Sequence, residues 1–106
     1  MKLFLKNPNG SYDAVAEYNV QSNEFIVLKG SRVSYTISTS PTFQGTIAIK
    51  NQRALHVKDN IVQEDVSFRS SSAAGNFVTG YSTNGPKYWK NEKGIMLKVI
   101  MQELKR

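Results

Sequence analysis

The side chains best suited to binding another molecule lie in residues 68–97. This segment contains three serines in a row, an Asn84-Gly85 pair and the run Tyr88-Trp89-Lys90. An asparagine amide can form two hydrogen bonds to the edge of an adenine. Tyrosine rings can stack on bases, and lysines bind phosphates. These residue types favour a recognition surface over a reaction centre.

The same segment has a structural interpretation that stays open at this point. Trp89 is of a type that is usually mostly buried, so it can fill the edge of the core while neighbouring lysines remain in water. The binding interpretation assigns a phosphate to the N-terminus of a helix over residues 71–79. Asn84 then reads a base edge, Tyr81 or Tyr88 stacks on a base, and Lys87 and Lys90 hold the backbone.

Catalytic and metal-binding chemistry has little support. His56 is the only histidine, and the expected helix over residues 46–58 contains no acidic residue that could form a metal pair with it. Asp59, Glu64 and Asp65 fall around an expected turn and strand edge, where solvated carboxylates are common. The serine run lacks the Gly-x-Ser-x-Gly pattern of a nucleophile elbow, and the chain has no cysteine. We therefore expect no enzyme activity, no cofactor and no metal.

Charge is concentrated at the C-terminal end. The net charge is +6, and residues 86–106 alone contain six basic and two acidic residues. Such an excess favours a polyanionic partner, because each phosphate that is neutralised releases condensed counterions. The alternative is a solvated basic tail that aids solubility. No apolar run approaches the roughly 20 residues needed to cross a bilayer, so we expect a cytoplasmic protein.

The elements that position these residues suggest a small α+β domain. Residues 2–6, 13–19 and 24–29 read as strands separated by turn signals, which predicts a three-stranded antiparallel meander within a strand-rich region 1–39. Residues 33–39 allow either a further strand or the approach to a helix that starts near residues 38–42. A helix over about residues 46–58 and one strand over residues 61–68 complete the region 43–69.

The last region, residues 70–97, is predicted in more detail. Ser70 suits an N-cap, and Ala74 and Val78 lie four apart on a core-facing stripe of the helix that follows. Gly80 stands where a left-handed residue ends a helix. The Asn84-Gly85 pair predicts a turn with positive φ. Residues 95–104 fit a strand or a helix. One domain spans residues 1–106, with an N-terminal sheet, two short helices and a C-terminal strand or helix.

These motifs resemble a known family. Ser70-Ser71-Ser72-Ala73-Ala74, Gly80-x-Ser82-x-Asn84-Gly85, Trp89-Lys90 and Gly94-x-x-Leu97 are similar to domain-of-unknown-function family 4357, as are Asp13-Ala14 and Phe25-x-Val27-Leu28-x-Gly30-Ser31. That family is similar to the restriction enzyme adenine methylase associated (RAMA) domain. Both occur in restriction–modification proteins, and family 4357 also follows GIY-YIG nuclease domains. The resemblance implies a module that binds DNA or reads a modified base.

By position, the resemblance assigns the functional segment to Ser70–Ala74, Ser82, Asn84, Gly85, Trp89 and Lys90. Three residues depart from the family pattern. Ser71 replaces a proline, Gly75 replaces an alanine and so weakens the helix by about 1 kcal/mol, and Pro86 replaces the first tryptophan of a Trp-x-x-Trp pair. If that tryptophan stacks on a base, Tyr88 must substitute for it here. This departure affects modified-base reading more than general DNA binding.

The combined expectation is a non-catalytic nucleic-acid-binding module. Its candidate contact residues are Ser70, Ser72, Tyr81, Ser82, Asn84, Gly85, Lys87, Tyr88, Trp89 and Lys90. The chain starts directly at the first family motif, so we expect any nuclease or methyltransferase partner to be a separate subunit. The alternative is a protein-interaction module whose basic C-terminal face docks an acidic partner.

Overall fold

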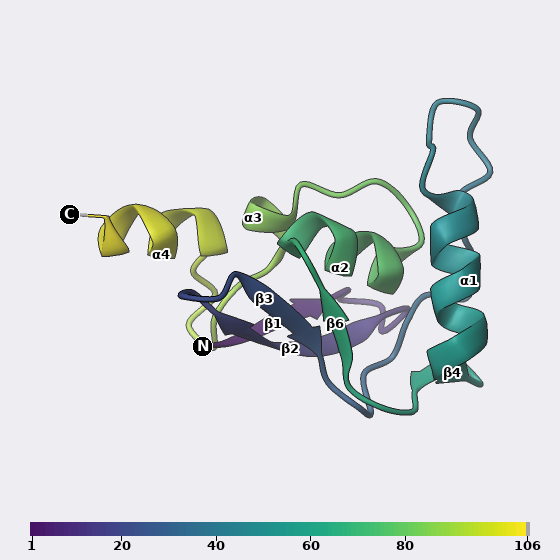
Figure 1. Ribbon diagram of the computed structural model, residues 1–106, viewed down its shortest axis with the longest axis horizontal. Helices are drawn as coiled ribbons and strands as arrows, with labels where there is room; N and C mark the ends of the chain where they lie inside the picture. The colour runs from purple at the N-terminus through teal and green to yellow at the C-terminus, as the bar shows by residue number, and fades with distance from the viewer. Residues whose placement is uncertain (106) are drawn as a thin grey trace.

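The computed structural model describes residues 1–105 as two layers, a sheet covered on one face by helices (Figure 1). The main sheet has the order β1-β2-β3-β6, and every neighbouring pair is antiparallel. Strands β1 (Lys2–Lys6), β2 (Asp13–Asn19) and β3 (Glu24–Val27) form the predicted meander. The α+β prediction is confirmed.

Alternation along the strands creates the inner face of the sheet. Leu3 and Leu5 of β1 are buried, as are Ala14, Ala16 and Tyr18 of β2. Successive side chains of a strand point to opposite faces, so every second residue enters the core. Phe25 of β3 stacks in a tilted arrangement between Tyr18 and Trp89, with ring centroids 5.5 Å and 4.9 Å away.

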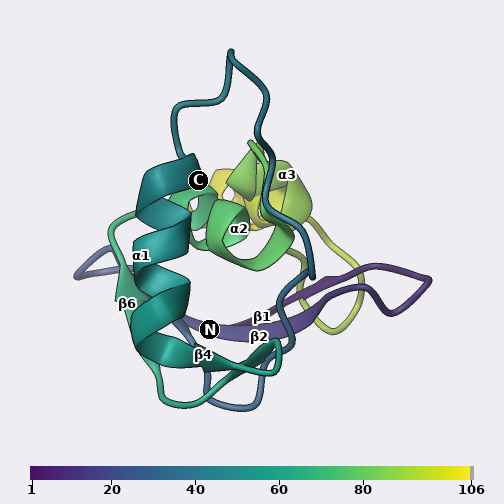
Figure 2. The same cartoon turned by 90° about the vertical axis from the view of Figure 1, so that its right-hand side faces the viewer.

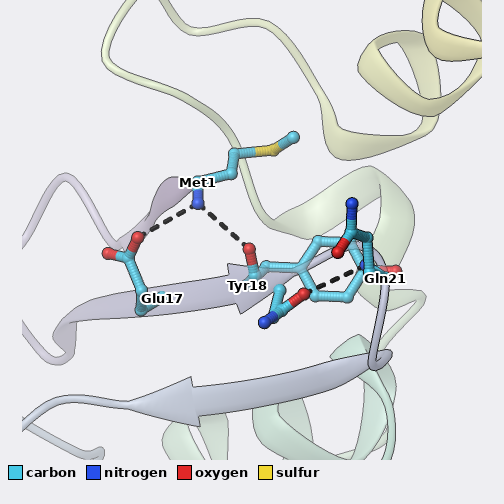
Figure 3. Close-up of polar contacts among 5 residues, drawn as sticks. Met1, Glu17, Tyr18 and Gln21 are labelled. Carbon is cyan, nitrogen blue, oxygen red and sulfur yellow. Dashed lines mark hydrogen bonds and ion pairs between the residues drawn. The ribbon is translucent and has the colours of Figure 1, made fainter.

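The amino group of Met1 is held on β2. It donates to the Glu17 carboxylate and to the Tyr18 carbonyl oxygen, each over 3.0 Å (Figure 3). The Tyr18 amide donates in turn to the Met1 carbonyl oxygen over 2.8 Å. Beside them, the Gln21 amide donates to the Asn19 side chain over 3.0 Å and closes the turn after β2. These bonds secure the end of the sheet that faces α4.

The predicted helix over residues 46–58 is confirmed as α1 (Thr46–His56), followed by β4 (Val57–Lys58). The single strand predicted over residues 61–68 is wrong. The structure has β5 (Ile61–Val62), paired with β4, and β6 (Val66–Phe68), paired with β3. The polar residues 63–65 between them carry the chain from one sheet to the other, and the Asp65 carboxylate accepts a bond from the Lys29 amide over 2.9 Å.

Residues 33–39, for which two conformations were open, form part of a long connection that projects beyond α1 (Figure 2). The expected helix start near residues 38–42 is wrong, because α1 begins at Thr46, whose hydroxyl donates to the Ser38 carbonyl over 2.6 Å. The ambiguous segment 95–104 resolves as α4 (Leu97–Leu104). Helices α1 and α4 lie at opposite ends of the molecule (Figure 1).

Arg53 fastens α1 to the end of α2 (Ser71–Thr79). Its guanidinium donates to the carbonyl oxygens of Phe77 and Ser34 over 2.9 Å and 2.7 Å, and within residues 1–105 no carboxylate forms an ion pair with it. A cation near a helix C-terminus is favoured by the helix dipole. Burial lowers the pKa of Arg53 from its ordinary value to about 10, so the guanidinium remains charged at neutral pH.

No helix within residues 1–105 has the length and apolar character needed to span a membrane.

Candidate nucleic-acid interface

Helix α2 begins and ends as its sequence predicts. The Ser70 hydroxyl accepts a hydrogen bond from the Ala73 amide over 3.0 Å, which confirms the N-cap. Ala74 and Val78 are fully buried, as the stripe requires. Gly80 has φ +83°, and a Cβ there would lie 2.1 Å from the Thr36 carbonyl oxygen. The position therefore needs glycine both for its backbone conformation and for its close packing.

The Asn84-Gly85 pair does not form the predicted turn with positive φ. Asn84 has φ −91° and is the N-cap of a short helix, α3 (Gly85–Tyr88). Pro86 lies in the first turn of α3, where a missing amide hydrogen costs nothing because that turn has no internal acceptor. Gly85 is required for a different reason. A Cβ at this position would lie 2.3 Å from the Ser71 carbonyl carbon and 2.4 Å from the Ser72 nitrogen.

Gly85 and Trp89 join α3 to the first turn of α2. The Gly85 amide donates to the Ser72 hydroxyl over 3.0 Å, and the Trp89 indole N–H donates to the Ser71 carbonyl over 2.9 Å. Trp89 is completely buried, which settles its place in the core. Three of the predicted contact residues, Ser72, Gly85 and Trp89, thus make internal contacts that position the others.

The helical geometry of α3 directs its side chains to different sides of the helix. Gly85 faces α2, and each residue is rotated by about 100° from the one before it. Lys87 therefore points away from α2, and it is exposed. Pro86 and Tyr88 lie on opposite sides of this lysine, and each lines a separate hollow in the surface.

Tyr88 and Lys90 share the first hollow with residues of β1. The hollow has a volume of about 450 Å³ and is lined by Phe4, Lys6, Tyr88, Lys90, Asn91, Glu92 and Gly94. Backbone bonds of 2.7 Å and 3.0 Å pair Lys90 with Phe4 as in an antiparallel ladder. Paired residues share a face of a sheet, so Lys90 lies with Phe4 on the outside while Trp89 points inward.

A tyrosine cluster adjoins Tyr88. Tyr81 is 39% exposed, and its hydroxyl oxygen lies 3.4 Å from the hydroxyl oxygen of the buried Tyr12. The hydrogen bond with Tyr12 and partial burial raise the pKa of Tyr81 to about 12, although interaction with the Tyr88 hydroxyl acts in the opposite direction. Tyr81 is therefore a neutral phenol at physiological pH. We call Lys6, Tyr81, Lys87, Tyr88 and Lys90 the tyrosine–lysine face.

The remaining predicted contact residues lie outside the first hollow. Ser70, Ser82 and Asn84 are exposed. The Asn84 side chain makes no capping bond to α3, so its amide is not used to stabilise that helix. The Ser70 hydroxyl is used by the α2 cap, which reduces its capacity to bind a ligand.

Sequence reasoning did not place Phe4 and Lys6 in the site. They are more than 80 positions from Lys90, and only the pairing of residue 90 with β1 brings them together. It also left out Lys98, Gln102 and Lys105 of the α4 region. These three residues line a second hollow of about 410 Å³ with Pro86. Their spacing of four and three residues was the available signal, since it places them on one helical face.

The residues considered for catalysis do not join this face. His56 ends α1, and its Nδ1 lies 3.3 Å from an oxygen of Glu64, in a geometry that forms no hydrogen bond. Within residues 1–105, no three histidine, cysteine, aspartate or glutamate side chains gather as metal ligands would.

The comparisons with known proteins identify a family and give no individual relative. No curated protein and no solved structure matches the chain. The family described as domain of unknown function (DUF4357) matches residues 5–101, which include parts of β1 and α4 and the whole of every other strand and helix named above. The chain therefore belongs to the DUF4357 family.

Proposed function

We propose that this protein is a non-catalytic nucleic-acid-binding module that works with a separate nuclease or methyltransferase subunit. The observation that carries the proposal is the tyrosine–lysine face. Tyr88, Lys6 and Lys90 line one hollow, and the exposed Lys87 stands next to it.

The chemistry of this face suits a nucleic acid with accessible bases. A tyrosine ring provides a stacking platform for any base, which is worth about 1–3 kcal/mol per base. Lysines around the ring attract the phosphates on either side of that base. The hollow of about 450 Å³ leaves room for a ring beside Tyr88. Stacking of this kind requires a base that is not already stacked in a duplex, so single strands are the preferred ligand.

Fluorescence anisotropy tests the proposal. Labelled single-stranded and duplex DNA, with and without N6-methyladenine, are titrated with the protein across about 50–200 mM salt. We expect saturable binding that weakens as salt rises, with single strands bound more tightly. A preference for methylated DNA would make the module a modification reader. No binding to any of these DNAs at the lowest salt would contradict the proposal.

A protein-interaction module is the second candidate. Ile95, Val99 and Leu104 are apolar side chains that are 40%, 36% and 57% exposed beside the lysines of the C-terminal region. An apolar surface flanked by lysines suits an acidic protein partner. This candidate predicts weak, non-saturating DNA binding and a complex that persists at salt concentrations where DNA dissociates.

A further inference from the structure

Helix α4 lies at one end of the molecule (Figure 1), and the second hollow is lined by residues of α4 together with residues of β2, α2 and α3. We call it the α4 groove, and it has a volume of about 410 Å³. Its walls come from the end of β2 and the turn after it, the start of α2, Pro86 of α3, the face of α4 that carries Lys98, and Lys105 just after α4. We propose that the α4 groove binds the sugar–phosphate backbone of a single-stranded nucleic acid whose base occupies the first hollow. This inference rests on the proposed function.

The charge of the groove favours an anion. Lys98 and Lys105 line it, and none of its ten lining residues is a carboxylate. Within residues 1–105, neither lysine forms an ion pair with an acidic side chain. Two unpaired cations in one groove repel each other, so an anion that enters it relieves this repulsion and gains attraction to both.

The neutral residues of the groove add hydrogen-bond donors. The Tyr18 hydroxyl donates to the Asn23 side-chain oxygen over 2.9 Å, which orients the Asn23 amide and leaves its N–H₂ group for a ligand. Gln102 lies on the same face of α4 as Lys98, four residues further on. Ser71, the first residue of α2, also lines the groove. Phosphate oxygens accept hydrogen bonds and donate none, so this donor-rich lining suits them.

The apolar part of the groove favours a sugar over a free phosphate ion. Leu97 is almost fully buried and Met101 is partly buried along the floor, and Pro86 forms part of one wall. A deoxyribose ring presents carbon atoms that can cover these side chains. A groove that combines an apolar floor with lysines at its rim matches the alternation of sugars and phosphates along a strand.

Continuity across α3 links the groove to the first hollow. Pro86 lines the α4 groove, Tyr88 lines the first hollow, and Lys87 is exposed between them. A nucleic-acid strand that crosses α3 therefore meets a cation at each position: Lys90 beside the base, Lys87 on α3 and Lys98 in the α4 groove. The two hollows act as consecutive subsites for one strand.

A double variant tests the groove. Lys98→Ala/Lys105→Ala is compared with a matched control, Lys50→Ala/Lys58→Ala, which removes the same charge from exposed positions on α1 and β4. The measurement is anisotropy of a labelled oligothymidine of about 12 nucleotides at several salt concentrations. Loss of two phosphate contacts on a single strand lowers the magnitude of the salt slope by about 1.4. We expect this drop in the groove variant and little change in the control.

An abasic oligodeoxyribose phosphate of the same length separates the two subsites. It has no base to stack, so we expect Lys98→Ala/Lys105→Ala to weaken its binding and Tyr88→Leu to leave it unchanged. If the groove variant keeps the wild-type salt slope while Tyr88→Leu weakens oligothymidine binding, the groove inference is wrong and the proposed function stands. If the wild-type protein binds neither oligomer at about 50 mM salt, both are wrong.

Discussion

The inner and outer sides of residues 85–90 differ in almost every physical property. On the inner side, Gly85 and Trp89 are buried and joined to the first turn of α2 by direct hydrogen bonds. On the outer side, Lys87 and Lys90 are exposed and no acidic side chain within residues 1–105 forms an ion pair with them. The comparison teaches that the most recognisable motif residues build the scaffold, while less distinctive residues form the proposed binding face.

The largest effect is expected from removing the inner anchor. Trp89→Ala would leave a cavity beside Phe25 and strip the Ser71 carbonyl of its donor. Large-to-small changes of this kind cost about 3–5 kcal/mol in the free energy of unfolding. Urea denaturation measures the loss, and Trp89→Phe, which keeps most of the apolar volume, should lose less. A change below about 1 kcal/mol would contradict the anchoring role.

Gly85→Ala sharpens the distinction between close packing and helix propensity. Alanine is favoured over glycine within a helix by up to about 1 kcal/mol, so propensity alone predicts stabilisation. The added Cβ would meet the backbone of Ser71 and Ser72 at 2.3–2.4 Å, which forces α3 away from α2. We expect a net destabilisation of about 1–3 kcal/mol, measured by urea denaturation. Equal or higher stability would show that the two helices separate without cost.

On the outer side, Tyr88 is expected to affect binding more than stability. Tyr88→Leu keeps an apolar side chain against the core but removes the ring, which should weaken single-stranded DNA binding by about 1–3 kcal/mol. Tyr88→Phe is the control, because it retains the ring and should bind almost normally. Anisotropy titrations and thermal melts of both variants make the comparison. Equal affinity of Tyr88→Leu and the wild type for single-stranded DNA would contradict the stacking role of Tyr88.

The smallest effect is expected on the ionisation of Tyr81, which contacts the buried Tyr12 and belongs to the tyrosine–lysine face. Its pKa is raised to about 12, mainly by the hydrogen bond with Tyr12. Because the folded state holds this proton more tightly, the stabilising contribution is complete below pH 10, the ordinary pKa, and is lost as pH rises toward 12. Ultraviolet titration should show one late-ionising tyrosine, and Tyr12→Phe should shift that ionisation to lower pH. An unchanged titration would contradict the coupling.

Local signals in the sequence predicted much of the fold. The apolar run of residues 2–6, the alternation in residues 13–19, the Ser70 cap and the left-handed Gly80 were all confirmed, because each depends on neighbours in the chain. The prediction of one strand over residues 61–68 was wrong because Val62 pairs with β4 and Val66 pairs with β3. No local sequence pattern indicates such a change of partner.

The site was predicted less completely than the fold. The prediction of a turn with positive φ at Asn84-Gly85 was wrong. Glycine is suited both to positive φ and to close packing, and only the packing of α3 on α2 shows that close packing applies here. The pairing of Lys90 with Phe4 brings Lys6 into the hollow, and this is a contact between opposite ends of the chain. Residue types indicated a candidate chemistry, whereas long-range packing decides which of the candidate side chains are exposed.

A nuclear magnetic resonance titration of the ¹⁵N-labelled protein with oligothymidine tests the central claim most directly. The proposed account predicts that amide shifts are concentrated at Lys87, Tyr88 and Lys90 and along the groove-facing side of α4, with α1 as an internal control that stays unchanged. Added salt should reverse these shifts. Shifts centred on α1 or the residue 35–45 connection, or none at all, would contradict the assignment of binding to the outer side of α3.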